Sequence, residues 1–74
     1  MVKPNQYWSI LDENNETRIM KILQIDDQGK VFYTFQHWGW RYSAFMKVDY
    51  FKVGYQGLRQ LSKKETIKLV LKNG

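Results

Sequence analysis

Short apolar stretches separated by polar turns dominate the first half of the chain. Aromatic and aliphatic residues fill 7–11 (YWSIL), and the Asp and Asn residues of 12–16 (DENNE) suit a turn because their side chains bond nearby backbone. Apolar residues alternate imperfectly along 17–25 (TRIMKILQI), which favours a long bent strand, with a helix as the alternative. In the following DDQG segment, Gly29 offers the positive φ that a hairpin turn requires.

A second hairpin is predicted around a glycine inside an aromatic stretch. Residues 30–36 (KVFYTFQ) alternate as a third strand, and Gly39 is the turning residue before a fourth strand at 40–45 (WRYSAF). Beyond this strand, Ser43 is expected to cap a short helical turn, because its hydroxyl can accept a hydrogen bond from the backbone. A short fifth strand is then predicted at 51–55.

The C-terminal segment carries the signature of a helix start. Ser62 and Glu65 have the spacing of a capping box, in which each side chain bonds the backbone N–H of the other. Strong helix formers follow, so we predict a helix over 62–72, although the alternation within 66–72 also allows a strand. Lysines four residues apart would form a stripe along this helix: Lys64, Lys68 and Lys72.

These elements together predict a mainly β fold. We expect a small five-stranded barrel over about 5–57 with a C-terminal helix, in a single domain that covers 1–74. One face of the second and third strands is expected to supply most of the interior. The predicted core residues are Ile19, Leu23, Ile25, Val31, Tyr33 and Phe35.

Composition narrows the classes of function. The chain has no Cys, which removes thiol chemistry and a thiolate zinc site, and its one His cannot make a metal site unaided, so no cofactor is expected. No nucleophile–base spacing or phosphate-binding loop accompanies His37, Glu13 or Asp49, so we do not expect an enzyme. No apolar run approaches the length of a membrane span and the polar start lacks a secretory signal, so we expect a cytoplasmic protein without membrane contact.

Charge is distributed unevenly along the chain. Residues 1–38 carry a formal charge of −1 and residues 39–74 one of +6, within a total of +5. The second half is therefore the expected contact region for an anionic partner. The alternative is that the lysines only keep a ring-rich domain soluble.

The stretch HWGWRYSAF, residues 37–45, gathers rings and an arginine around Gly39. Rings stack on bases and lysines neutralise phosphates, so rings next to basic residues favour nucleic-acid binding. The same residue types are enriched at protein interfaces, and one or both Trp could instead close the barrel end. The predicted binding residues are Trp38, Trp40, Arg41, Tyr42, Lys47, Lys52, Lys63, Lys64, Lys68 and Lys72.

The order YWSIL, polar loop, RIMKILQI, DDQG, KVFYTF, Gly turn and RYSAFMKVDYF resembles small SH3-like (Tudor-like) β-barrel proteins of phages and bacteria. The resemblance implies ligand-binding aromatic residues at the open barrel end, with a carboxylate from Asp12 or Glu13 if the ligand is a methylated cation. The nearest ring positions are Trp8, Tyr33, Trp38 and Trp40. The basic second half argues against a cationic ligand, so a nucleic-acid-binding module is preferred, with a phage-type adaptor or inhibitor that binds a host protein as the alternative.

Overall fold

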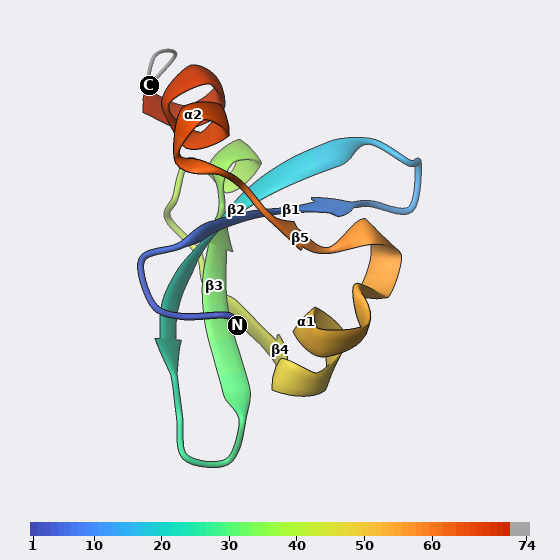
Figure 1. Ribbon diagram of the computed structural model, residues 1–74, viewed down its shortest axis with the longest axis vertical. Coiled ribbons are helices and arrows are strands. Elements are labelled where there is room, and N and C mark those ends of the chain that lie inside the picture. Colours follow the sequence, from blue (N-terminus) through green and yellow to red (C-terminus); the bar gives the residue numbers. More distant parts are fainter. Residues whose placement is uncertain (72–74) are drawn as a thin grey trace.

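The computed structural model describes residues 1–71, which form a five-stranded antiparallel sheet with short helices around it (Figure 1). The strands are β1 (Tyr7–Leu11), β2 (Thr17–Ile25), β3 (Lys30–Phe35), β4 (Ala44–Lys47) and β5 (Arg59–Gln60). Their order in the sheet is β4-β3-β2-β1-β5, so β4 and β5 form opposite edges. The sheet is not closed by these strands, and the expected barrel is therefore not confirmed.

Helical segments occur after β3 and in the second half of the described chain. They are the 3-10 turn η1 (Gln36–Trp38), α1 (Val48–Val53), the 3-10 turn η2 (Tyr55–Gly57), α2 (Lys63–Thr66) and the π-helical turn η3 (Ile67–Leu71). The last two run on from one another and form the short C-terminal helix.

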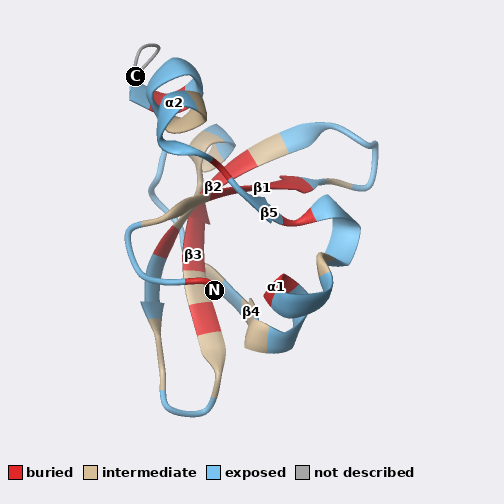
Figure 2. Cartoon of the chain, viewed as in Figure 1, coloured by how far each residue is buried: buried red, intermediate tan, exposed pale blue. Residues whose placement is uncertain are grey.

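The two faces of the sheet differ in how they are covered. The core face carries the main apolar cluster, and α1 lies over it, with the ring of Phe51 edge-on to that of Trp8 at 5.1 Å between centroids. Met20, Ile22 and Val31 are completely buried there. Figure 2 shows the buried segments of β1, β2 and β3 in red. Burial of such side chains is the main force that holds a domain of this size together.

The register of β2 corrects the predicted core. The pairing of β2 with β3 shifts between Ile22 and Gln24, which makes Leu23 an extra residue in a β-bulge. Because a bulge reverses the alternation beyond it, Ile22 and Ile25 both face the core, whereas Leu23 is 41% exposed. The prediction that Leu23 is a core residue is therefore wrong.

The other predicted core residues divide between the faces. Val31 and Tyr33 are buried on the core face, with Ile25 and Phe35 partly buried against the same cluster. Ile19 is buried on the opposite face, which we call the outer face.

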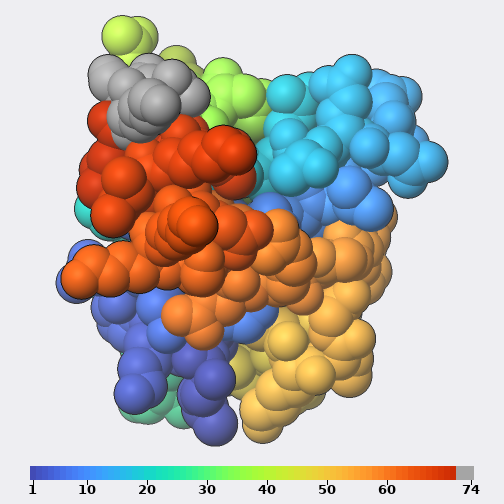
Figure 3. All heavy atoms as spheres, turned by 45° about the horizontal axis from the view of Figure 1, so that its top comes forward, coloured from blue at the N-terminus to red at the C-terminus, as the bar shows by residue number. Residues whose placement is uncertain are grey.

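The C-terminal helix covers one end of the outer face. Val70 of η3 and Leu61 form a second apolar cluster with Ile19, and Tyr7 packs against it. The backbone N–H of Leu61 donates to the carbonyl of Tyr7, and Figure 3 shows this C-terminal segment in contact with the N-terminal strand segment. The helix therefore lies on the outer face and reaches the end of β3, where Nε2 of Gln36 donates to the carbonyl of Leu69, while the outward residues of β4 stay exposed.

The capping box predicted for this helix is present. The hydroxyl of Ser62 accepts from the backbone N–H of Glu65, whose carboxylate accepts from the N–H of Ser62. The helical prediction is confirmed for residues 63–71, where the strand alternative is wrong, and position 72 lies outside the described residues.

The segment after Gly39 differs from the prediction. Gly39 and Trp40 both adopt left-handed backbone conformations, so the expected strand over 40–45 begins only at Ala44. The expected order of helix and strand is reversed as well: α1 follows β4 and is preceded by Lys47, not capped by Ser43. The expected strand at 51–55 is the end of α1 followed by η2.

Candidate functional site

The turn after β3 sends the two tryptophans to opposite faces of the sheet. Trp38 packs edge-on against Phe35 on the core face, with ring centroids 4.8 Å apart. Trp40 packs edge-on against Tyr7 on the outer face, at 5.9 Å. The positive φ of Gly39 and Trp40 produces this separation, and a left-handed conformation is strained for a residue as large as Trp. The predicted ring cluster is therefore not one surface.

The two residues that follow Trp40 are both exposed. Tyr42 is 67% exposed and its ring lies 6.5 Å from that of Trp38, so it extends the core-side ring group. The side chain of Arg41 folds back over Gly39. A β-carbon on Gly39 would lie 3.7 Å from the Nε atom of Arg41.

An aromatic and basic surface occupies the uncovered end of the outer face. We call it the phenylalanine strip, and its residues are Lys21, Lys30, Phe32, Phe45 and Lys47. Register and alternation place them on one face of β2, β3 and β4. The rings of Phe32 and Phe45 lie 5.6 Å apart, and Phe45 is 52% exposed.

Positive charge dominates this strip. Lys30 and Lys47 stand directly opposite one another across β3 and β4, an arrangement in which like charges repel. The Nζ atom of Lys30 lies 5.0 Å from the ring centroid of Phe45. Among residues 1–71, neither lysine forms an ion pair with a carboxylate, and no Asp or Glu occurs at the outward positions of β2, β3 and β4. The strip is thus suited to an anion.

A second surface lies on the core-face side, which we call the tyrosine groove. It has a volume of about 430 Å³ and is bordered by the loop after β1, by η1 and by η2. Its Tyr, Phe and Trp rings belong to Tyr33, Phe35, Trp38, Tyr50 and Tyr55, and the imidazole of His37 lines it as well. Its charged residues are Asp12, Glu13 and Arg18. Tyr50 and Tyr55 are stacked at 4.6 Å and both are more than two-fifths exposed.

The carboxylate of Asp12 already forms hydrogen bonds and an ion pair that hold the loop beside the groove. Its carboxylate accepts from the backbone N–H groups of Asn14 and Glu16 and lies 3.0 Å from Nε of Arg18. The hydrogen bond from the Glu16 N–H, with further help from Asn14 and Arg18, lowers the pKa of Asp12. Arg18 also pairs with Glu16 at 3.0 Å. Glu13 is therefore the carboxylate of this loop that is best placed to meet a ligand.

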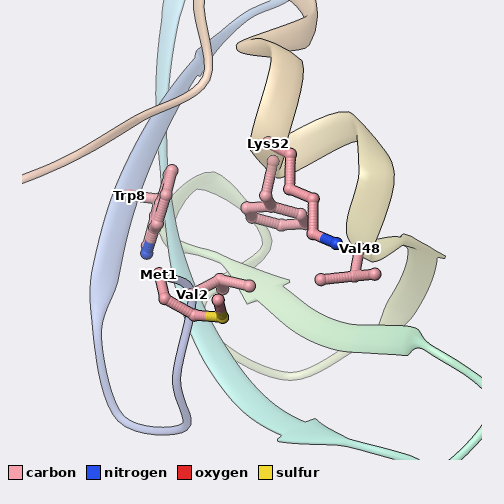
Figure 4. A pocket seen from close by; sticks show the side chains of 6 residues that line it. Met1, Val2, Trp8, Val48 and Lys52 are labelled. Atoms are coloured by element: carbon pink, nitrogen blue, oxygen red, sulfur yellow. The ribbon is translucent and has the colours of Figure 1, made fainter.

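The remaining predicted lysines lie apart from the strip. Lys52 lies on α1 beside Val48, and Trp8 lines the other side of the same pocket on the core-face side, as Figure 4 shows. The predicted lysines of the C-terminal helix are Lys63, Lys64 and Lys68, all exposed, and the helix that carries them packs on the outer face. Lys72 lies outside the described residues. Of the predicted residues, Lys47 alone belongs to the phenylalanine strip.

Sequence reasoning did not select Lys21, Lys30, Phe32 or Phe45 as site residues. Lys21 and Lys30 belong to the acidic half of the chain, so a count of charge along the sequence passes over them. The alternation within 30–36 does place Phe32 opposite the core side, and this was the signal for an outward ring. The pairing with β4, which brings Phe45 and Lys47 beside it, requires the register.

No known protein family, curated protein or solved structure that was compared with this chain matches it. Within residues 1–71, no helix has the length and apolar character needed to cross a membrane. The same residues contain no group of three or more His, Asp or Glu side chains arranged to hold a metal ion. The two surfaces are therefore the features of the described residues that bear on function.

Proposed function

We propose that this protein is a small non-enzymatic module that binds nucleic acid through the phenylalanine strip. The observation that carries the proposal is the opposed pair Lys30 and Lys47 with the exposed ring of Phe45 beside it. The repulsion between the two ammonium groups is relieved when a phosphate lies between them. The neighbouring ring offers a surface on which a base can stack.

The proposal includes a fold of SH3-like (Tudor-like) type and a cytoplasmic location. Support for the fold comes from the antiparallel order β4-β3-β2-β1-β5 and from the short 3-10 turn that precedes β5. Support for the location comes from composition, because a chain without Cys gains nothing from an oxidising compartment.

A salt titration tests the proposal. Labelled DNA and RNA oligonucleotides are titrated with the parent protein and with Lys47→Ala and Lys52→Ala at a series of salt concentrations. Each phosphate contact contributes about one unit to the slope of log K against log salt, so Lys47→Ala is expected to reduce the slope by about one unit. Lys52→Ala is the matched control, because Lys52 lies on α1, away from the strip.

Two results would contradict the proposal. Folded parent protein that binds no oligonucleotide at low salt would remove nucleic acid as the partner. If Lys47→Ala and Lys52→Ala reduce the slope of log K against log salt equally, affinity depends on the net charge of the protein and not on the residues of the strip.

The tyrosine groove supports a second candidate function, the docking of a partner protein. Its Tyr and Trp rings, which include the stacked and exposed pair Tyr50 and Tyr55, are of the kind that anchors protein interfaces. A pull-down from bacterial lysate, with and without nuclease, separates the two candidates. Capture of a protein that survives nuclease and is lost in Tyr55→Ala would favour docking in the groove.

A further inference from the structure

The phenylalanine strip also indicates which form of nucleic acid it accepts. This inference rests on the proposed function and concerns the same residues. The rings of Phe32 and Phe45 are tilted 48° to one another on neighbouring strands, in the open part of the outer face. In a duplex the faces of the bases are covered by neighbouring base pairs, so a ring on a sheet surface can stack only on an unpaired base.

The lysines lie at two ends of the strip. Lys21 is paired with Thr34, whereas Lys30 stands four residues before Thr34 on β3. At about 3.3 Å per residue the two positions are about 13 Å apart along the sheet. Phe32 lies between them. Thr34 is buried and the Nζ atom of Lys21 lies 5.9 Å from the ring centroid of Tyr7, so the accessible positive charge beside the rings is at the Lys30 end.

The width of the strip favours a single nucleic-acid strand, with one sugar–phosphate backbone, over a duplex. The C-terminal helix covers the outer face at β1 and β2 through Val70 and Leu61, which pack against Ile19. The open part runs from the edge strand β4 to the uncovered half of β2, and strands lie about 4.8 Å apart, so it is about 10 Å wide.

We propose that the phenylalanine strip selects single-stranded nucleic acid: an unpaired base stacks on the Phe32–Phe45 rings while a neighbouring phosphate lies beside the Lys30–Lys47 pair. The rings provide the discrimination between single strand and duplex. The lysines provide attraction to either form.

The experiment compares oligothymidylate, oligouridylate and a duplex of the same length by fluorescence anisotropy. Phe45→Ala is tested against the matched control Tyr55→Ala, which removes a similarly exposed ring from the tyrosine groove. Thermal melting establishes that both variants are folded. We expect tighter binding of the single strands than of the duplex. We also expect Phe45→Ala to weaken single-strand binding at least about fivefold and to leave duplex binding unchanged.

The failures of the two proposals are distinguishable. Equal affinity for single strand and duplex, with no effect of Phe45→Ala, overturns the single-strand inference and leaves the nucleic-acid proposal standing. Loss of single-strand binding in Tyr55→Ala but not in Phe45→Ala also overturns it, because the stacking site would then be the groove. Absence of binding to all three oligonucleotides overturns the proposed function itself.

Discussion

At the scale of single residues, Thr34 offers a test of packing on the outer face. Its hydroxyl oxygen is buried and has no hydrogen-bond partner among the described residues. A buried hydroxyl without a partner costs free energy that an isosteric methyl group does not. We therefore expect Thr34→Val to leave stability unchanged or to raise it by up to about 1 kcal/mol, measured by urea denaturation. Thr17→Val, at an exposed position of β2, is the control, and a loss above about 1 kcal/mol only at Thr34 would reveal a partner for the hydroxyl.

Two neighbouring residues of β2 provide the second test. Ile22 is completely buried and Leu23 is 41% exposed, so Ile22→Ala should cost about 2–5 kcal/mol and Leu23→Ala less than about 1 kcal/mol. Equilibrium unfolding of the two variants checks this directly. A larger loss in Leu23→Ala than in Ile22→Ala would contradict this assignment and would mean that the predicted face of β2 was right.

Ile22 and Leu23 also show which parts of the fold could be predicted from the sequence and which could not. The apolar and polar pattern identified β1, β2, β3 and the turn at 26–29 correctly, because alternation and turn chemistry are local. The bulge at Leu23 is not local, since it depends on how β2 pairs with β3. The prediction chose the wrong face of β2 at Ile19 and Leu23, and the bulge is what returns Ile25 to the core side.

The candidate site was harder to predict for a related reason. Trp38 and Trp40 are adjacent to one glycine in sequence and lie on opposite faces in space, because Trp40 adopts a left-handed conformation that its residue type disfavours. The lysines of the strip come from three strands, so only the register assembles them.

At the scale of elements, the junction between β5 and α2 depends on Glu65. Its carboxylate lies 2.7 Å from an Nη atom of Arg59 and also accepts from the N–H of Ser62. These contacts, Arg59 first, lower the pKa of Glu65 from 4.5 to about 2. Because the folded-state pKa is the lower one, this contribution to stability is complete above about pH 4.5 and is lost as pH falls through about 2.

Thermal unfolding across this pH range tests the junction. The parent protein should lose stability progressively between about pH 4.5 and 2, and Glu65→Gln should show a smaller dependence because it has no proton to gain. Glu13→Gln, in the exposed loop after β1, is the control for carboxylates in general. The same pH dependence of stability in the parent and in Glu65→Gln would show that Arg59 and Ser62 do not bind the Glu65 carboxylate in solution.

The hairpin of β3 and β4 carries a further prediction. Because Lys30 and Lys47 oppose one another, Lys47→Glu should replace repulsion by attraction and raise stability by a few tenths of a kcal/mol up to about 1 kcal/mol. The same variant should bind oligonucleotides more weakly. Lys52→Glu, on α1, should give no gain in stability, and a destabilised Lys47→Glu would show that the two lysines are not close neighbours in solution.

At the scale of the whole molecule, the sheet separates two surfaces of different chemistry. The core face leads into the tyrosine groove, with its rings and the carboxylate of Glu13, whereas the outer face presents rings with lysines and no carboxylate on β2, β3 and β4. A negatively charged ligand is therefore expected on the outer face, and an uncharged or cationic protein segment suits the groove.

The most direct test is a map of the contact surface by nuclear magnetic resonance. Isotope-labelled protein is titrated with oligothymidylate, and the backbone amide shifts and the Trp indole N–H signals are followed. We predict that the largest changes occur at Lys30, Phe32, Phe45 and Lys47, with the Trp38 indole unaffected. Changes centred on Trp38, Tyr50 and Tyr55 instead would contradict the account, because the nucleic acid would then lie in the tyrosine groove.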